Sequence, residues 1–387
     1  MWLFRSGLVL IAYIIIIIYT GIRVLALIKY LLPSLKAYIY WPLYILFGLS
    51  YIIVFLLRLD RIGALRLAVM YSLPFLIYLC LGLLVLELVR FIIRLKTGER
   101  LSRGLSACIT GIALGMAVLA MVYGAFNAQN IRTVHYEVTL NKSGGLSGKT
   151  GLRIALVSDI HIGRTVKRKW LSKIVDEVNR SNPDLICIAG DIFDNNIDTI
   201  SDIEGVKEEL RRLHAPLGVY ACQGNHDVDR LSLREEGRTD RIQEFLSGVG
   251  INFLLDEVIL VADSFYVAGR RDVRLIGSRQ ARKTAAELTA GLDKSRPLII
   301  MDHQPVDFPG LEEAGVDLIL SGHTHGGQFF PGNIVTARMF KNAGAVHYGH
   351  WRGGTAQGLV SSGAGLWGPP VRVATRSEVA VIDVKFK

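Results

Sequence analysis

The stretch Ile154–His161 reads Ile-Ala-Leu-Val-Ser-Asp-Ile-His, an apolar run that ends in a carboxylate and an imidazole two residues apart. The apolar part predicts a buried strand, and alternate side chains of a strand point to the same face. Asp159 and His161 are therefore expected to point together beyond the strand end. A metal site at that point requires further ligands from other parts of the chain.

From residue 151 onward, predicted strands alternate with predicted helices. The strands are at 154–157, 185–189, 218–221, 264–268, 275–277, 298–301 and 318–320, and the helices at 167–180, 206–213, 241–246 and 284–292. Alternation of this kind predicts layered α/β packing around a shared core.

Side chains of the metal-binding type follow five of these strands. They are Asp159 and His161, then Gly190, Asp191 and Asp194, then Gly224, Asn225, His226 and Asp227, then Asp302 and His303, and finally Gly322, His323 and His325. A single Asp, Asn, Gly or His in such a place is usually a helix cap, a turn residue or a structural hydrogen-bonding group. Open α/β sheets, however, bind ligands beyond the carboxyl ends of their strands. The coincidence at five strand ends therefore predicts a metal site.

These combined motifs resemble those of the calcineurin-like metallophosphoesterase superfamily. The resemblance covers roughly residue 152 to the C-terminus, and the segment Ser321–Gln328 is similar to that of a bacterial membrane-associated branch. It implies a four-layer α/β/β/α sandwich, which an all-α transmembrane bundle precedes here. Some relatives in the wider superfamily cleave the pyrophosphate of a UDP-linked diacylglucosamine.

The resemblance also implies a site for two divalent metal ions. Asp159, His161, Asp191 and His325 would hold one ion, and Asp191, Asn225, His303 and His323 the other, with Asp191 bridging. Mixed nitrogen and oxygen ligands suit Mn, Fe or Zn. Two such ions activate a hydroxide that attacks phosphorus. His226 is expected to be the general acid for the leaving oxygen, and Asp227 is expected to orient His226 or tune its charge.

Four apolar segments, at 7–28, 38–57, 67–89 and 105–128, precede this domain. Each approaches or exceeds the roughly 20 residues that cross a bilayer as a helix. Four membrane helices are expected, with three as the alternative because the second segment is short. Glu87 is expected near the end of the third helix, with a functional carboxylate inside the membrane as the alternative. The connection between the third and fourth segments is the most basic, so it should be cytoplasmic and the catalytic domain should lie outside the cytoplasm.

The chain is accordingly divided into a transmembrane domain (1–128), a linker with a strand (129–150) and a phosphoesterase domain (151–387). Gly144 and Gly145 predict a turn in the linker. The formal net charge of +10 arises largely from basic residues between the apolar segments, which indicates membrane topology and argues against nucleic-acid binding. The four cysteines form no Cys-x-x-Cys pair and are interpreted as buried thiols.

Several features bear on the substrate. Arg164 either contacts a phosphate oxygen or is a solvated surface residue. The apolar loops at 329–331 and 366–370 either pack in the core or form a groove for a lipid tail at the membrane interface. We therefore expect a membrane-anchored phosphoesterase, for example a phosphodiesterase, that acts on a phosphorylated, lipid-linked or envelope substrate.

Two other functions remain open from the sequence. One is a membrane sensor or scaffold whose phosphoesterase domain binds a phosphorylated ligand without turnover. The other is a transporter with an appended enzyme, which would require polar residues along the apolar segments, where few are present. The oligomeric state is open.

Overall fold

The computed structural model describes residues 2–57, 63–98, 101–143, 151–194, 197–228, 238–273 and 282–387. The chain forms two compact units: residues 1–126 with 368–371, and residues 127–367 with 372–387. The expected turn at Gly144–Gly145 and the expected strand at 275–277 lie outside the described residues.

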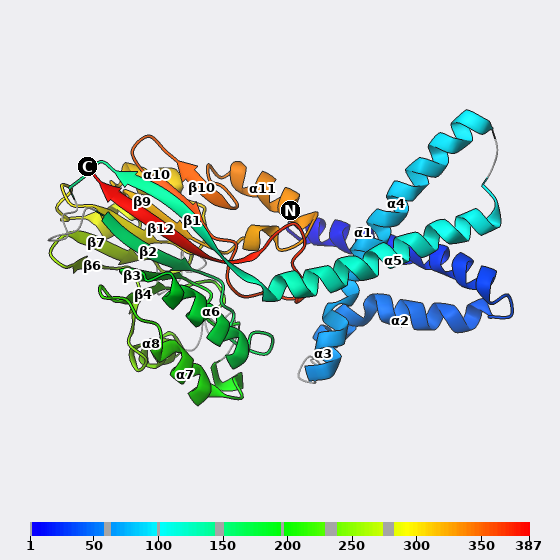
Figure 1. The fold of residues 1–387 in the computed structure, drawn as a ribbon, viewed down its shortest axis with the longest axis horizontal. Coiled ribbons are helices and arrows are strands. Elements are labelled where there is room, and N and C mark those ends of the chain that lie inside the picture. The colour runs from blue at the N-terminus through cyan, green and yellow to red at the C-terminus, as the bar shows by residue number, and fades with distance from the viewer. Residues whose placement is uncertain are drawn as a thin grey trace. The chain divides into compact units, whose positions relative to one another are not determined.

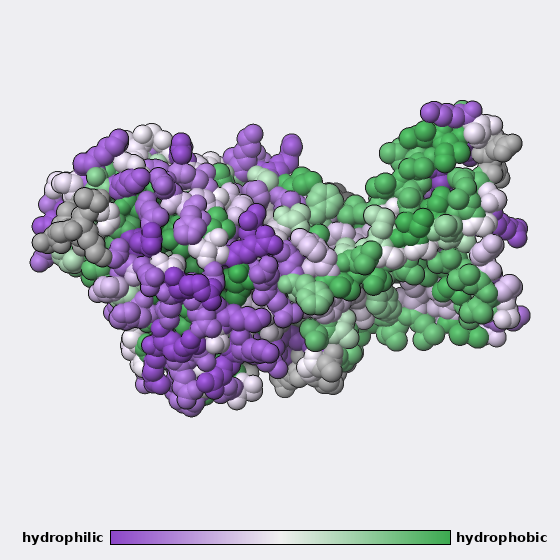
Figure 2. Space-filling view, in the orientation of Figure 1, coloured by the Kyte–Doolittle hydropathy of each residue, from purple (hydrophilic) through white to green (hydrophobic). Residues whose placement is uncertain are grey.

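The first unit is helical. Its helices are α1 (Trp2–Leu31), α2 (Ala37–Leu56), α3 (Gly63–Met70), α4 (Ser72–Thr97) and α5 (Arg103–Gln129), the last of which ends in the second unit. The described residues contain four spans that are long and apolar enough to cross a membrane, at Leu10–Leu31, Ala37–Val54, Leu65–Thr97 and Arg103–Gln129. These spans overlap the four expected segments, and the third continues past the expected end at residue 89 to Thr97. Apolar side chains dominate their visible surface in Figure 2, whereas polar ones dominate the α/β unit.

Small residues let these helices approach closely. A Cβ added at Gly21 of α1 would lie 2.8 Å from the Trp41 ring of α2, and one at Gly82 of α4 would lie 3.4 Å from Ala113 of α5. Close approach at small residues is the usual packing mode of helices in lipid. Glu87 forms ion pairs with Arg23 and Arg90, and α4 continues beyond it to Thr97. The expectation that Glu87 lies near the helix end is therefore wrong.

The second unit contains two six-stranded sheets (Figure 1). The first has the order β1 (Ile131–Leu140), β12 (Ser377–Phe386), β2 (Gly151–Val157), β3 (Leu185–Ala189), β4 (Val219–Cys222) and β5 (Ile251–Leu254). The second has the order β10 (Gly349–Arg352), β11 (Gln357–Val360), β9 (Leu318–Ser321), β8 (Leu298–Met301), β7 (Phe265–Gly269) and β6 (Glu257–Val261). Strands β2 to β5 are mutually parallel, as are β7, β8, β9 and β11.

The alternation of side chains along each strand produces four layers. In β2, Ile154 and Leu156 belong to the core between the two sheets, whereas Ala155 and Val157 belong to the core under α6 (Arg168–Arg180), α7 (Ile203–Arg211) and α8 (Arg238–Ser247). Helices α9 (Ala285–Thr289) and α10 (Phe308–Glu313) cover the outer face of the second sheet. Figure 1 shows α6 to α8 and α10 on opposite sides of the sheets, which confirms the expected α/β/β/α sandwich.

The segment interpreted as a linker is part of the sandwich. Strand β1 pairs in parallel with β12 along its whole length, from Ile131 opposite Ser377 to Leu140 opposite Phe386. Val138 and Leu140 are buried in the core between the sheets. Residues 131–140 are thus an edge strand of the domain, so its boundary at residue 151 is corrected toward the N-terminus.

Candidate metal centre

The parallel strands bring their carboxyl ends, and the polar residues that follow them, to one edge of each sheet. Asp159 and His161 follow β2, Asp191 follows β3, and Asn225 and His226 follow β4. From the second sheet, His303 follows β8, and His323 and His325 follow β9. A cavity of about 360 Å³ is lined by Asp191, Asn225, His226, His323 and His325. Residues from both sheets therefore meet at one place.

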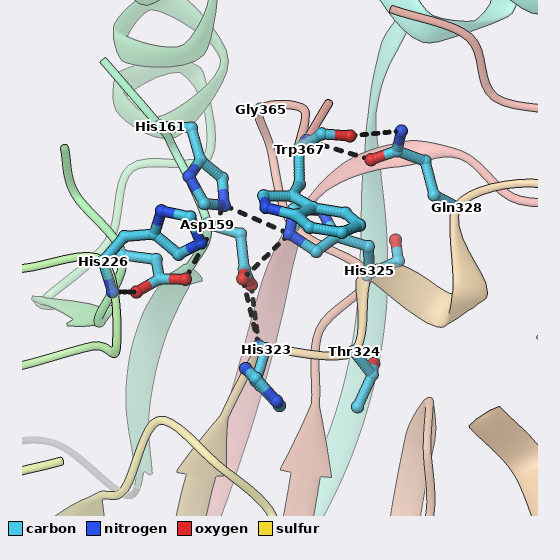
Figure 3. Close-up of polar contacts among 12 residues, drawn as sticks. Asp159, His161, His226, His323, Thr324, His325, Gln328, Gly365 and Trp367 are labelled. Carbon is cyan, nitrogen blue, oxygen red and sulfur yellow. Dashed lines mark hydrogen bonds and ion pairs between the residues drawn. The ribbon is translucent and has the colours of Figure 1, made fainter. Parts of the chain in front are cut away.

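Three side chains form one compact group. The Nε2 atoms of His161 and His325 are 3.1 Å apart, and His325 Nε2 is 3.3 Å from Asp159 Oδ1. Figure 3 shows the three side chains pointing toward one another. The main-chain N–H of His323 donates to both carboxylate oxygens of Asp159, at 3.1 and 3.0 Å, and so fixes that carboxylate. Two imidazoles and a carboxylate at these distances could hold one metal ion.

Asp191 lies between this group and a second one. Its Oδ2 atom is 3.7 Å from His161 Nε2 and 3.2 Å from His303 Nε2, while its Oδ1 atom accepts a hydrogen bond from the main-chain N–H of His226 at 2.7 Å. Asp191, His303 and His323 form a second group with the spacing that a metal ion requires. Asp191 belongs to two of the three groups of described residues that could hold an ion, as does His161.

The hydrogen bonds of His303 fit a metal ligand. Its Nδ1 atom lies 2.7 Å from the Ala189 carbonyl oxygen, an acceptor, so Nδ1 carries the hydrogen. The buried Nε2 atom lies 3.2 Å from Asp191 Oδ2, and once its proton is removed both atoms are electron-pair donors. A cation between these two electron-pair donors would satisfy both, and a backbone carbonyl that fixes the imidazole is the usual support of a metal-bound histidine.

The electrostatics of the buried groups point the same way. Burial raises the pKa of Asp159 and lowers the pKa values of His161 and His325. Burial also lowers the pKa of His303, but the Asp191 carboxylate outweighs this effect and raises that pKa to about 10. Neutral His161 and His325 keep lone pairs available, and a cation would supply the positive charge that now falls to His303.

The backbone at these residues adopts a conformation that non-glycine residues avoid. Among the described residues, eleven non-glycine residues have positive φ, and five of them are expected metal ligands: Asp159, His161, Asp191, His323 and His325, with φ between 50° and 71°. Such conformations persist only where the surrounding structure enforces them, and they concentrate at functional sites.

Gly224 is required by a close contact. A Cβ atom at this position would overlap the main-chain nitrogen and Oδ1 of Asp191. The glycine therefore allows the loop after β4 to approach the carboxylate that occupies the centre of the site. Gly224 is thus required because a side chain there would clash with Asp191, and not merely because the chain turns.

Comparison with known proteins agrees with this geometry. Residues 152–327 match the family model described as calcineurin-like phosphoesterase. The chain is 27% identical over 270 residues to an uncharacterized metallophosphoesterase of Campylobacter jejuni, covering 70% of this chain and 67% of that protein. It is 32% identical over 288 residues to a transmembrane protein with metallophosphoesterase domain from Danio rerio, covering 71% and 62%.

Residues 152–327 therefore contain a calcineurin-like phosphoesterase domain. A third relative, an uncharacterized metallophosphoesterase of Helicobacter pylori strain J99, is 32% identical over 241 residues, covering 60% of this chain and 59% of that protein. The matched regions thus span about three fifths to two thirds of the relatives' own lengths. The α/β unit is a phosphoesterase hydrolase domain.

In this phosphoesterase domain, Asp227 does not have the role expected from the sequence. Its carboxylate accepts hydrogen bonds from the main-chain N–H groups of Ile192, Phe193 and Gly224. Burial raises the pKa of Asp227 to about 7. The His226 ring is oriented instead by the Asp194 carbonyl oxygen, 2.9 Å from Nδ1. These contacts do not place Asp227 as the group that orients His226, because Asp227 joins the loops that follow β3 and β4. The alternative expectation, that Asp227 tunes the charge of His226, stays a prediction.

The two apolar loops meet at the cavity. The Gln328 amide donates from Nε2 to the Trp367 carbonyl oxygen at 2.7 Å, and its Oε1 atom accepts from the Trp367 N–H at 3.0 Å (Figure 3). Phe329 and Trp367 both line the cavity. Arg164, in contrast, is not among the described residues that line it, so its contact with phosphate stays a prediction.

Sequence reasoning missed Arg372. This side chain is fully buried and donates to the carbonyl oxygens of His325, Ser362 and Gly365, at 3.2, 2.7 and 3.0 Å. Burial lowers its pKa to about 10. Arg372 therefore holds the loop that carries His325 in place through buried hydrogen bonds. The only signal in the sequence is a single charge inside the apolar run Pro369–Val373.

Proposed function

We propose that this protein is a membrane-anchored, metal-dependent phosphohydrolase that cleaves a phosphoester or pyrophosphate bond. The observation that carries the proposal is that metal-binding side chains from the ends of five strands, in two sheets, lie close together. They are Asp159, Asp191, Asn225, His161, His303, His323 and His325. Relatives named as transmembrane proteins with metallophosphoesterase domains and the four apolar spans support the membrane anchoring.

The proposed ligands form two sets that share one residue. Asp159, His161, Asp191 and His325 hold the first ion, and Asp191, Asn225, His303 and His323 hold the second. When bound, a pair of divalent cations supplies an activated water and neutralises charge on the phosphoryl oxygens. The nitrogen and oxygen ligands suit Mn, Fe or Zn, and manganese is the first ion to supply in an assay.

His226 is the proposed proton donor to the leaving oxygen. It lines the cavity, and the Asp194 carbonyl oxygen holds Nδ1, so Nε2 is the ring nitrogen available to the substrate. Its ring centroid is 4.8 Å from that of His161. Proton transfer by a positioned histidine contributes about 10²–10⁴-fold to a rate.

The proposed substrate is lipid-linked or another envelope molecule, and the domain is proposed to lie outside the cytoplasm. The cavity is lined by the apolar side chains of Phe329, Met339, Phe340 and Trp367 as well as by the proposed metal ligands. A phosphorylated molecule with an apolar portion matches both surfaces. The chain's own membrane spans would keep the domain beside such molecules.

The purified full chain, supplied with Mn²⁺, is expected to hydrolyse a water-soluble aryl phosphodiester, with the released phenolate as the readout. His226→Ala should slow this turnover about 10²–10⁴-fold while keeping the bound metal, because His226 acts on the leaving group. His214→Ala is the matched control, since His214 is exposed and is not among the described residues that line the cavity.

Two results would contradict these assignments. Metal-loaded protein without any turnover would make the domain a binding module. Loss of metal in His226→Ala would make His226 a ligand, which its closeness to His161 and Asp191 allows geometrically.

A further inference from the structure

Exposed apolar side chains of the α/β unit gather at one place. Among its described residues, the large apolar side chains that are exposed are Leu260, Val306, Phe330, Ile334, Val335, Met339 and Trp367. Five of these seven belong to helix α11 (Gly332–Lys341) or to the two loops joined by Gln328 and Trp367. Clustered apolar exposure on a soluble-type domain marks an interaction surface, whereas scattered exposure does not.

Helix α11 presents an apolar face to its surroundings. Ile334 and Val335 are each 57% exposed and Met339 is 61% exposed, and the helix has no buried residue. A helix of a globular domain normally buries its apolar face against the core. In α11 the apolar face is turned outward instead, so something outside the domain should cover it.

The charges on α11 favour an anionic lipid surface. Arg338 and Lys341 are exposed in the last turns, and residues 332–341 include no acidic residue. An outward apolar face combined with basic residues is the pattern of a helix that lies in the headgroup region of a bilayer. The same chain contributes four candidate membrane spans, so a bilayer is always near the domain.

The helix also forms part of the cavity wall. Thr336, Met339 and Phe340 of α11 line the cavity together with Phe329 and Trp367. Met339 is both exposed and cavity-lining, so the cavity mouth lies beside the outward face of α11. The matched family region ends at residue 327, before α11 begins.

We propose that α11, with Phe330 and Trp367, lies in the interfacial region of a lipid bilayer, so that the metal-site cavity opens at the membrane surface. This placement deepens the proposed function, because it would let a lipid-linked substrate reach the cavity without leaving the membrane. It depends on membrane anchoring but not on turnover, so each can fail separately.

Spin labels test the placement in the full chain. Cys80 and Cys108 are replaced by Ser, while Cys187 and Cys222 are buried and remain. Single labels at Ile334→Cys and Val335→Cys are compared with one at Leu260→Cys on β6, which is 39% exposed and distant in sequence. The protein is placed in nanodiscs of phosphatidylethanolamine and phosphatidylglycerol, and collision rates with oxygen and with a water-soluble nickel chelate are measured.

Labels at 334 and 335 should show a several-fold higher ratio of oxygen to nickel collisions than the label at 260, because oxygen concentrates in lipid and the chelate is excluded. Equal ratios at the three sites would overturn the placement. Low collision rates with both reagents at 334 and 335 would also overturn it, since a protein surface, such as a second copy of the chain, would then cover α11.

Turnover of the soluble aryl phosphodiester is measured on the same samples. A lipid-exposed α11 without turnover would refute the proposed hydrolysis and leave the docking surface standing. Turnover with a water-exposed α11 would refute only the docking surface.

Discussion

At the scale of single residues, the site depends on atoms that must come close together despite mutual repulsion. Asp159, Asp191 and three imidazoles are nearly inaccessible to solvent, and none of the contacts among them is an ordinary carboxylate–cation pair with Lys or Arg. Isolated buried charges are costly, so buried carboxylates are usually paired or bind metals. The positive φ values and the contact at Gly224 show that the backbone is shaped to hold this arrangement.

Asp191 should be the least replaceable of these residues. Asp191→Ala is expected to reduce phosphodiester turnover to background and to lower the metal content of the purified chain, because it removes an oxygen ligand that lies between the two groups. Asp176→Ala on α6 is the control, since that carboxylate is exposed and pairs with Arg212 at the surface. Near-normal turnover of a folded Asp191→Ala protein would refute the bridging role.

At the scale of secondary-structure elements, the strand before the domain is part of its core. Leu140 of β1 is 2% exposed and belongs to the apolar core between the two sheets. Leu140→Ala is therefore expected to destabilise the α/β unit by about 2–5 kcal/mol, the usual cost of a Leu-to-Ala change in a core. Thermal unfolding of the full chain in detergent, followed by near-ultraviolet circular dichroism, measures this loss. Thr139→Ala, one residue away on the other face of β1, should have a much smaller effect, and equal losses would place β1 outside the core.

A second element-scale feature supports the strand that carries His303. Asp302, which follows β8, pairs with Arg270 at 2.9 Å and with Arg282, and all three side chains are buried. Removing one partner of a buried ion pair leaves an uncompensated charge, which costs about 3–5 kcal/mol.

Asp302→Asn is accordingly expected to lower the unfolding temperature strongly and to weaken metal binding through displacement of His303. Asp293→Asn provides the comparison, because the Asp293–Arg296 pair is exposed and a surface pair contributes only about 0–1 kcal/mol. Similar unfolding temperatures for the two variants would show that the buried pair contributes no more to the free energy of unfolding than the exposed pair does.

At the scale of the whole molecule, the question is on which side of the membrane the phosphoesterase domain lies. Arg90, Arg94 and Lys96 lie in the last part of α4, and α5 begins at Arg103. Basic residues at such a connection favour the cytoplasm, which predicts that the chain after α5 lies outside it.

A reporter enzyme that is active only outside the cytoplasm should therefore be active when fused after Lys387. Fusion after Arg103, at the start of α5, is the internal comparison and should give no activity. The opposite pattern would place the catalytic domain in the cytoplasm and would require an intracellular substrate.

The sequence by itself determined the order of elements and most of the site. Strand periods, the polar residues at strand ends and long apolar segments are local features, and parallel strands necessarily bring their carboxyl ends to one edge. These features placed Asp159, His161, Asp191, Asn225, His303, His323 and His325 at one edge before any coordinates. Their assignment as metal ligands came from the family resemblance and stays a prediction.

Only the tertiary structure decided which distant groups meet. The pairing of β1 with β12 joins residues about as far apart as the domain allows, and the bonds of Asp227 to the loop after β3, of Asp194 to His226 and of Arg372 to the His325 loop each depend on how the loops close. The sequence could not show that the apolar face of α11 points outward, because an apolar helical face has the same sequence pattern whether protein or lipid covers it.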